Sequence, residues 1–420
     1  MINHSDSDHI LCDCLVIGGG PAGSVSASIV ASAGHDVVQI EREVHPRPHV
    51  GESLMPATND VLERLGIQKR IEQLRFPRKV GVQFVNASGK ASMPFYFRKH
   101  DDRPDSETWH VDRAKLDHCL FDLAAEHGTR TMQSVRFLRL DRDEPGNHEV
   151  VVDDNGKIRR INAKVLIDAS GQQSVLAKHF RIKNTEPNRK NVGIWTYYRT
   201  EKEVFADKTI TIIAKTKEAN GWYWLIPVDS KTLSVGLVGD VKTIQSSAST
   251  NEKRFLLYVS KNEFVDNYIK SRELTQFGEF IAAKDFSYSA SQPSGDGWVL
   301  TGDALGFIDP VYSTGVLLAL KTGELAGDAV VAGLEKGDLS KQQLGSWYPK
   351  YSEKVDLLRN LVDLFYDREF SFGKFISDNP DCSYQLADLL MGRVFGKPST
   401  DFFEKVLAWK KTLTHSDYSK

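Results

Sequence analysis

The residues most able to do chemistry stand near the N-terminus, where residues 18–23 read GGGPAG and fit the pattern G-x-G-x-x-G. In such a loop Gly18 permits a tight turn, Gly20 lets the backbone approach a pyrophosphate, and Gly23 allows a helix to pack closely on a strand. The N-terminus of that helix offers backbone N–H groups to the phosphates. Glu41 lies where a carboxylate can accept hydrogen bonds from ribose hydroxyls. The pattern predicts a dinucleotide site, whose contacts are Gly18, Gly20, Ala22, Gly23 and Glu41.

A loop of this kind works only between a strand and a helix, and the flanking sequence predicts both. Residues 11–17 form a short apolar run that suits a buried strand. Pro21 and Gly34 bracket a helix of small residues, and residues 35–43 predict the next strand. Together these segments predict a βαβ unit.

The rest of the chain divides into a β-rich middle and a helical end. Turn signals break residues 133–170 into short alternating runs. Further strands are predicted at 192–198, 209–214, 222–227, 233–239 and 298–301, and helices at 57–74, 252–271 and 315–335. Because several strands follow one another without helices between them, we expect an antiparallel sheet. The remainder, to Lys420, has a mostly helical pattern.

Composition sets limits on partners and setting. The formal net charge of -2 argues against a nucleic-acid partner, which needs a clustered basic face. No apolar run approaches the ~18 residues of a membrane span, and the N-terminus has no signal-peptide pattern. The 4 cysteines lack partners at ligand spacing, so we expect small buried side chains and no metal site. A reducing, cytoplasmic setting follows.

Both NAD and FAD are bound by a βαβ unit of this type, and three later segments favour FAD. Residues 111–117, VDRAKLD, resemble the R-x-x-L-D helix start of aromatic-hydroxylase-type flavoproteins. Residues 168–171, DASG, resemble their D-A-x-G segment, and residues 301–304, TGDA, resemble the G-D motif whose aspartate binds the ribityl chain. The resemblance implies FAD as the cofactor, with Arg113 and Asp303 among its contacts.

We therefore expect an α/β fold in which a Rossmann-type FAD-binding domain is interleaved with an antiparallel β-sheet substrate domain. The FAD-binding domain is predicted from residues 8–75, 108–182 and 285–340, and the substrate domain from residues 76–107 and 183–284. Residues 341–420 are predicted to form a mostly helical C-terminal region.

Three further motifs resemble signatures of the flavin-dependent halogenases. Residues 307–315, FIDPVYSTG, match F-x-x-P-x-x-S-x-G, and residues 222–227, WYWLIP, match W-x-W-x-I-P. Residues 49–56, HVGESLMP, are similar to the V-G-E-S-L-x-P stretch of the shorter phenol and pyrrole branch. The resemblance covers most of residues 10–335. It adds to the expected FAD contacts Glu52, Ser53, Pro310 and Gly315.

In that family, reduced FAD reacts with oxygen to give a flavin hydroperoxide, and chloride or bromide attacks its distal oxygen to give hypohalous acid. The resemblance implies a halide site at the backbone N–H groups of Thr314 and Gly315, at the start of a helix. It makes Trp222 and Trp224 a barrier that keeps the organic substrate away from the flavin. A bland alternative is that both tryptophans, which alternate on one strand and so face one side, are simply core residues.

The oxidant must then reach a separate substrate pocket, where the family places a lysine. Residues 76–84, FPRKVGVQF, resemble the K-x-G-x-x-F stretch around it, which nominates Lys79 as catalytic. Ser313, in the loop motif, is the second residue that the resemblance places in the catalytic site. A lysine next to Arg78 can equally be a solvated surface charge.

Departures from the family pattern narrow the substrate. Longer tryptophan halogenases carry a glutamate immediately before the loop serine, where this chain has Tyr312. That difference favours a small phenol- or pyrrole-like aromatic substrate, free or tethered to a carrier protein. The single nucleotide fingerprint favours a separate flavin reductase as the source of reduced FAD. Two alternatives stay open: an FAD monooxygenase or isoprenoid reductase of the same fold, and a flavoprotein without turnover that acts as a redox sensor or assembly partner.

Overall fold

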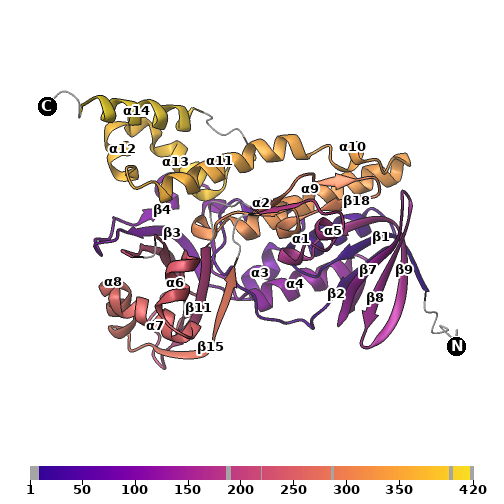
Figure 1. Cartoon of the computed structure of the whole chain (residues 1–420), viewed down its shortest axis with the longest axis horizontal. Helices are drawn as coiled ribbons and strands as arrows, with labels where there is room; N and C mark the ends of the chain where they lie inside the picture. Colours follow the sequence, from indigo (N-terminus) through magenta and orange to yellow (C-terminus); the bar gives the residue numbers. More distant parts are fainter. Residues whose placement is uncertain (1–8, 186–190, 219, 285–287, 397–400, 417–420) are drawn as a thin grey trace.

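The computed structural model describes residues 9–185, 191–218, 220–284, 288–396 and 401–416. In these ranges the strands form two large sheets and one small sheet, and the C-terminal helices run along the top of the view in Figure 1. The α/β fold predicted from the sequence is confirmed. None of the described helices is both long and apolar enough to cross a membrane.

The first large sheet carries the predicted βαβ unit. Its main path runs β17-β18-β9-β1-β2-β6, and β1 pairs in parallel with both β2 and β9. Helix α1 (Pro21–Ser32) connects β1 to β2, as the glycine loop requires. Two antiparallel strands, β7 and β8, extend the sheet beyond β9. Its strands are β1 (His9–Ile17), β2 (Val37–Glu41), β6 (Arg130–Gln133), β7 (Val135–Glu144), β8 (Asn147–Asp154), β9 (Lys157–Asp168), β17 (Ser294–Gly295) and β18 (Trp298–Leu300).

The second large sheet holds the strands predicted in the middle of the chain. Its main path runs β15-β11-β14-β13-β12-β3-β4, and β5 pairs with β3. The prediction of a purely antiparallel sheet is wrong at one place, because β3 and β12 pair in parallel. These two strands are far apart in the sequence, so no hairpin dictates their direction. The strands are β3 (Arg78–Val85), β4 (Phe95–Tyr96), β5 (Thr108–Trp109), β11 (Asn191–Arg199), β12 (Lys208–Lys215), β13 (Trp222–Pro227), β14 (Thr232–Asp240) and β15 (Thr275–Lys284).

Two predicted helices are each broken into a pair. The pattern at 57–74 forms α2 (Thr58–Arg64) and α3 (Gln68–Gln73), because Gly66 adopts a φ of +68° that ends the first helix. The pattern at 252–271 forms α7 (Asn251–Lys261) and α8 (Glu263–Lys270), because the side chain of Asn262 accepts from the Val265 N–H and caps a new helix.

The small sheet was not predicted, since strands this short carry no periodicity. It consists of β10 (Lys183–Thr185), β16 (Tyr288–Ala290) and β19 (Gly306–Phe307). Between and around the sheets lie α4 (Arg113–Glu126), α5 (Val175–His179) and α6 (Val241–Ser247).

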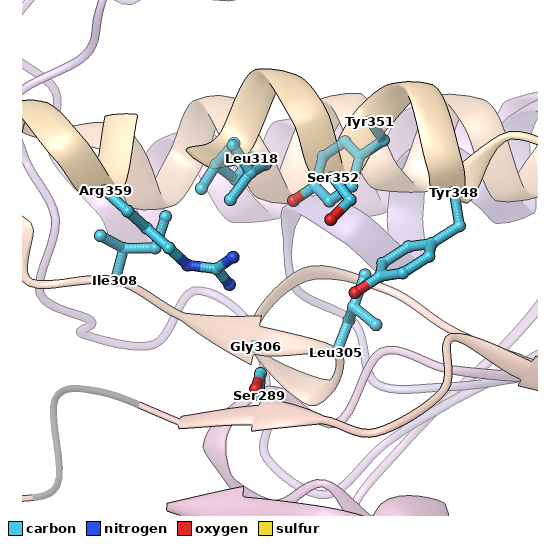
Figure 2. Close-up of a pocket in the computed structure, with 10 residues that line it drawn as sticks. Ser289, Leu305, Gly306, Ile308, Leu318, Tyr348, Tyr351, Ser352 and Arg359 are labelled. Carbon is cyan, nitrogen blue, oxygen red and sulfur yellow. The ribbon is translucent and has the colours of Figure 1, made fainter. Parts of the chain in front are cut away.

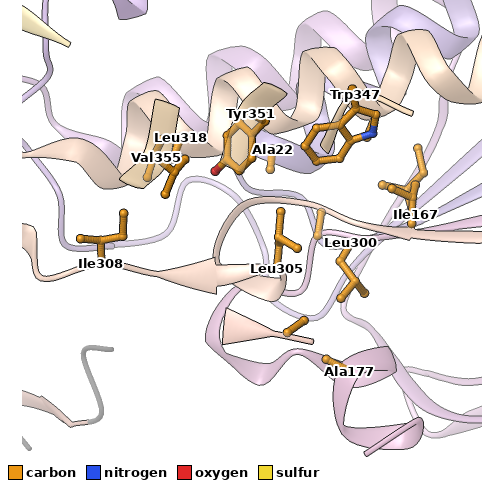
Figure 3. Packing of buried hydrophobic residues seen from close by; sticks show 14 of the residues in the cluster. Ala22, Ile167, Ala177, Leu300, Leu305, Ile308, Leu318, Trp347, Tyr351 and Val355 are labelled. Atoms are coloured by element: carbon orange, nitrogen blue, oxygen red, sulfur yellow. The ribbon is translucent and has the colours of Figure 1, made fainter. Parts of the chain in front are cut away.

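A long helix, α9 (Thr314–Lys336), joins the first sheet to the C-terminal region. It packs on α1 so closely that a Cβ atom at Gly323 would lie 2.4 Å from the carbonyl oxygen of Ala22. Figure 3 shows Tyr351 and Val355 of α11 against Leu318 of α9. The C-terminal helices are α10 (Lys341–Leu344), α11 (Tyr348–Tyr366), α12 (Phe372–Asp378), α13 (Ser383–Met391) and α14 (Phe402–Ser416). The C-terminal region is therefore packed into the same core as the βαβ unit.

Candidate active site

The glycine loop is closed on the strand side and open above Gly20. Gly18 has a φ of +118°, and a Cβ atom there would lie 2.3 Å from the carbonyl oxygen of Ala169. A Cβ atom at Gly23 would lie 2.1 Å from the carbonyl oxygen of Gly18. At Gly20 the single described atom within 4 Å of such a Cβ is Arg47 Nη2, at 3.7 Å. This arrangement fits a pyrophosphate that approaches the backbone at Gly20.

Glu41 and a cation that the sequence reasoning missed flank this opening. The carboxylate of Glu41 accepts a 2.7 Å hydrogen bond from the Gly19 N–H. The guanidinium of Arg47 lies 3.6 Å from Glu41 Oε2 and 3.2 Å from Asp117 Oδ2. Arg47 could have been found from topology, because residues that follow β2 gather at the same sheet edge as the glycine loop.

Arg113 holds the segment 49–56 against the start of α4. Its Nε and Nη2 donate to the two oxygens of Asp117 at 2.8 and 3.0 Å, and its Nη1 donates to the Val50 carbonyl at 2.7 Å. Burial opposes ionisation of Asp117, but the charge and hydrogen bonds of Arg113 outweigh it and lower the pKa of that carboxyl. Gly51, with a φ of +111°, leaves room for the guanidinium, since a Cβ there would lie 2.7 Å from Nη1.

Asp303 lies in a short 3₁₀ turn, Gly302–Ala304, directly after β18. Burial raises the pKa of Asp303 to about 7, and the positive charges of Arg113 and Lys183 only partly oppose this. A buried carboxyl of this kind is stabilised by hydroxyl donors, which the ribityl chain of FAD offers. The position therefore fits the predicted contact.

A hydrogen-bonded chain joins Glu52 to the tryptophan strand. Glu52 Oε1 accepts from the Tyr197 hydroxyl at 2.8 Å and from Ser234 Oγ at 3.4 Å. Ser234 Oγ in turn accepts from the indole nitrogen of Trp224 at 3.0 Å. Burial raises the pKa of Glu52, and the hydrogen bond from Tyr197 lowers it only in part.

Trp222 and Trp224 face the same side of β13, as their alternation predicts. Their ring centroids lie 5.8 Å apart, and both rings pack into the core that also contains Leu15 and Ile167 of the first sheet. Tyr223, between them, packs on the opposite face of the sheet. Their role as a barrier stays a prediction.

Lys79 is buried, so the alternative of a solvated surface charge is wrong. Its side chain on β3 is only 2 % exposed, and its amine donates a 2.7 Å hydrogen bond to the carbonyl oxygen of Leu54. The amine also lies 5.8 Å from the ring centroid of Phe97. Burial lowers the pKa of Lys79 to about 7.

His110 is a second buried group in this place that the sequence reasoning missed. Its Nδ1 and Nε2 lie 2.8 Å from the hydroxyl oxygens of Thr209 and Thr211, respectively. The Thr211 hydroxyl also lies 2.8 Å from Ser53 Oγ, so Ser53 lies near the imidazole of His110. The role of Ser53 as an FAD contact stays a prediction. Burial, with a further contribution from the charge of Lys79, lowers the pKa of His110 well below its usual value. No spacing in the sequence signals this contact.

The loop before α9 has the features of an anion site. Pro310 begins a 3₁₀ turn, Pro310–Tyr312, and Ser313 adopts a left-handed conformation with a φ of +63°. The first N–H groups of α9 have no intrahelical partners, as at the start of any helix, and no described side chain caps them. The hydroxyl of Thr314 is buried without a hydrogen-bond partner among the described residues, and a Cβ at Gly315 would meet none of their atoms within 4 Å. These observations fit a small anion beside Thr314 and Gly315.

A cleft beside this loop, lined in part by Ile308 and Leu318, is too small for an organic ligand. Figure 2 shows it between α11 and the strand end at Gly306, with Arg359, Ser352 and Tyr348 at its sides. Open space included, it spans about 340 Å³, but it leaves only about 20 Å³ for water-sized molecules. That is room for about one water molecule.

Comparison with known proteins identifies the family of the chain. A family model described as an FAD binding domain matches residues 11–327. The chain is 30% identical to the 1H-pyrrole-2-carbonyl-(peptidyl-carrier protein) chlorinase of Pseudomonas fluorescens, over 96% of this chain and 93% of that protein.

Two solved structures share the fold. The myxobacterial chondrochloren halogenase CndH is 27% identical with a TM-score of 0.77, over 85% of this chain and 83% of that one. The flavin-dependent brominase Bmp2 is 24% identical with a TM-score of 0.82, over 96% of this chain and 100% of that one. The chain therefore belongs to the flavin-dependent halogenase family, and FAD is its cofactor.

Proposed function

We propose that this enzyme places a halogen on a small phenol- or pyrrole-like aromatic ring, with chloride or bromide as the halogen source. The observation that carries the proposal is the buried amine of Lys79, held on the second sheet by the Leu54 carbonyl. When bound, reduced FAD supplies the two electrons that, with oxygen and a proton, turn halide into hypohalous acid and water. The chain's own residues must then bind the halide, retain the acid and direct it to one ring carbon.

The cofactor is bound, in this proposal, between the first sheet and the loop before α9. The backbone at Gly20 and the guanidinium of Arg47 receive the pyrophosphate, and Asp303 receives the ribityl hydroxyls. The N–H groups of Thr314 and Gly315 hold the halide, where the buried Thr314 hydroxyl is available as a further donor. Trp222 and Trp224 separate this space from the aromatic substrate.

Lys79 acts on the oxidant because its proton is easily gained and lost. With a pKa of about 7, the amine is present in both forms near neutral pH. The charged form can donate a hydrogen bond to hypohalous acid. The neutral amine can take its halogen to form a haloamine, as the O–X bond and one N–H bond break and water leaves. His110 lies close by but is held neutral by burial, so it does not supply a competing charge.

The substrate assignment rests on the surroundings of Tyr312. This side chain is buried, and its ring lies 6.1 Å from that of Phe365 and 6.3 Å from that of Phe84. Such apolar surroundings suit an uncharged aromatic ring. The similarity to a chlorinase that acts on a carrier-bound pyrrole supports a carrier-tethered substrate. A separate flavin reductase as electron donor and a cytoplasmic setting complete the proposal; the four cysteines, which are all free and buried, are compatible with reducing conditions.

The test is product analysis with the complete system. The protein is incubated with a flavin reductase, NADPH, oxygen and either bromide or chloride. Phenols and pyrroles are offered free and as carrier-protein thioesters, and products are identified by mass and isotope pattern. A halide-dependent halogenated product supports the proposal. A hydroxylated product without halide dependence would establish the monooxygenase alternative, and slow oxygen consumption without product would favour a flavoprotein without turnover.

A further inference from the structure

One hydroxyl group, at the C-terminal end of α11, connects the C-terminal region to two of the three halogenase motifs, residues 222–227 and residues 307–315. Tyr366 donates a 2.7 Å hydrogen bond to Asp309 Oδ2 in the loop motif. It accepts hydrogen bonds from the indole nitrogen of Trp222 at 3.0 Å and from Asn191 Nδ2 at 3.3 Å. A phenolic hydroxyl has one donor and two acceptor sites, so this oxygen is fully used.

The hydrogen-bond partners of Tyr366 lie on β11, on β13 and in the loop before α9. Two of these partners, Asn191 and Asp309, are also hydrogen-bonded to each other. Asn191, the first residue of β11, also donates to Asp309 Oδ2 at 3.2 Å. The other carboxylate oxygen, Oδ1, accepts from the Val311 N–H at 3.2 Å. Because Asp309 is only 1 % exposed, donors such as these contribute to stabilising its charge. The same carboxylate therefore holds the backbone of the turn that leads to Thr314.

Phe365, the residue before Tyr366, packs against the same tryptophan and the same loop through apolar contacts. The ring of Phe365 meets that of Trp222 edge-on at 6.5 Å and that of Tyr312 edge-on at 6.1 Å. Its carbonyl oxygen accepts a 2.7 Å hydrogen bond from the amine of Lys215 on β12. The end of α11 is thus fixed by contacts on both sides of the tryptophan.

We infer that Tyr366 is a positioning residue. It holds the loop that presents the halide donors and fixes the ring plane of Trp222. Through this residue the C-terminal region contributes to the active site. The inference rests on the proposed function for its kinetic consequence but not for the contact itself. Loss of the hydroxyl leaves a buried carboxylate and an indole N–H each short of a partner, and the loop can then shift relative to the tryptophan. Halide affinity should fall more than turnover, since the halide donors Thr314 and Gly315 follow directly on this loop.

The first measurement needs no halide, substrate or reductase. Hydrogen exchange by mass spectrometry is followed in FAD-loaded wild type, Tyr366→Phe and Tyr348→Phe, on a peptide that covers residues 308–317. Tyr366→Phe keeps the ring and removes one hydroxyl, and exchange in that peptide should become at least about fivefold faster. Tyr348→Phe is the same change at the other end of the same helix and should leave the peptide as in wild type. Asp309→Asn replaces one accepting carboxylate oxygen with an NH2 donor that faces another donor, so exchange in the peptide should rise at least as much as in Tyr366→Phe.

The second measurement is the split between KM and kcat. In Tyr366→Phe the KM for bromide should rise about fivefold, with kcat changed less than about twofold, while FAD affinity stays as in Tyr348→Phe. Equal exchange in all three proteins, or equal bromide KM in the two variants, would overturn the inference. If wild type forms no halogenated product but Tyr366→Phe still loosens the loop, the proposed function fails and the positioning contact stands.

Discussion

The amine of Lys79 donates a 2.7 Å hydrogen bond to the backbone carbonyl of Leu54. This contact joins β3 of the second sheet to the segment that follows β2 of the first sheet, and Leu54 itself is fully buried. An amine in such a place has few water molecules to stabilise its charge. Its protonation and its catalytic role should therefore depend on the same burial, and two predictions follow from this.

Lys79→Ala should separate oxidant formation from halogen transfer. The variant should bind FAD, consume oxygen and release hypohalous acid that a scavenger dye detects, because no observed contact of Lys79 reaches the glycine loop or the loop before α9. It should give at least about 100-fold less halogenated product at the wild-type position. Products are measured by chromatography and mass spectrometry beside the dye assay.

Lys79→Arg is the matched control. It keeps the positive charge and a hydrogen-bond donor, but its guanidinium stays protonated and is a poor nucleophile. A variant with near wild-type product yield would show that charge alone suffices. Wild-type rate and position in Lys79→Ala would remove Lys79 from the catalytic site altogether.

The burial of Lys79 also predicts how stability changes with pH. Its pKa is about 7 in the folded protein and 10.5 in the unfolded chain, so the folded state holds fewer protons between these values. The free energy of unfolding should rise with pH in that range, because the unfolded amine still holds a proton that the folded amine has already released. Below pH 7 the cost of the buried charge is fully present, on the order of a few kcal/mol.

Lys79→Met should therefore be more stable than wild type, with the largest difference below pH 7. The difference should shrink steadily from pH 7 to about pH 10, as measured by urea unfolding of the FAD-free proteins. Lys90→Met, at an exposed position, serves as the control and should show no such trend. A difference that is constant across this range would mean that the amine loses its proton at the same pH in the folded and unfolded states, so that burial does not lower the pKa of Lys79.

Sequence patterns found those parts of the site whose spacing is fixed by local backbone geometry. The glycine loop is one such part, since each glycine meets a steric need within a few residues. The loop before α9 is another. Sequence patterns did not find Arg47, His110 or Tyr366, which act through contacts that link distant segments. His110 meets Thr209 across 99 residues, and Trp222 meets Tyr366 across 144.

The errors in the fold have equally specific causes. Apolar periodicity continues across Gly66 and Asn262, so it predicted one helix where a positive φ and a capping side chain make two. The parallel pairing of β3 with β12 joins two strands that lie far apart in the sequence, so no short stretch of sequence predicts it. Both tryptophans are core residues, as the bland alternative predicts, and their role as a barrier stays a prediction.

Two glycines of the loop should fail in different ways when enlarged. Gly20→Ala, and more so Gly20→Val, should leave the FAD-free protein within about 1 kcal/mol of wild type, because only the flexible end of Arg47 lies near. FAD affinity should be lost, since the side chain occupies the approach of the pyrophosphate. Gly23→Ala should instead destabilise the FAD-free protein by about 1–3 kcal/mol, because its Cβ meets the backbone oxygen of Gly18.

These effects are read by urea unfolding without cofactor and by flavin fluorescence during titration. The two variants are controls for each other, since both add one methyl group to the same loop. Normal FAD affinity in Gly20→Val would place the pyrophosphate elsewhere. Unchanged stability in Gly23→Ala would mean that α1 can move away from β1 without loss.

Gly236 offers a way to move Trp224 without altering the tryptophan. This glycine pairs with Trp224 across β13 and β14, and a Cβ atom on it would lie 2.1 Å from the indole ring. In Gly236→Ala the ring must therefore shift, and its hydrogen bond to Ser234 should weaken. We expect a loss of about 1–3 kcal/mol in unfolding free energy.

If the ring of Trp224 is part of the barrier, more hypohalous acid should reach the scavenger dye in Gly236→Ala for each oxygen consumed. Trp224→Phe frees space in front of residue 236, so in the double variant the stability loss should be smaller than the sum of the two single losses. Additive losses would show that the ring had already moved away from β14. A wild-type ratio of dye oxidation to oxygen consumption in Gly236→Ala would mean that Trp224 packs the core but does not retain the oxidant.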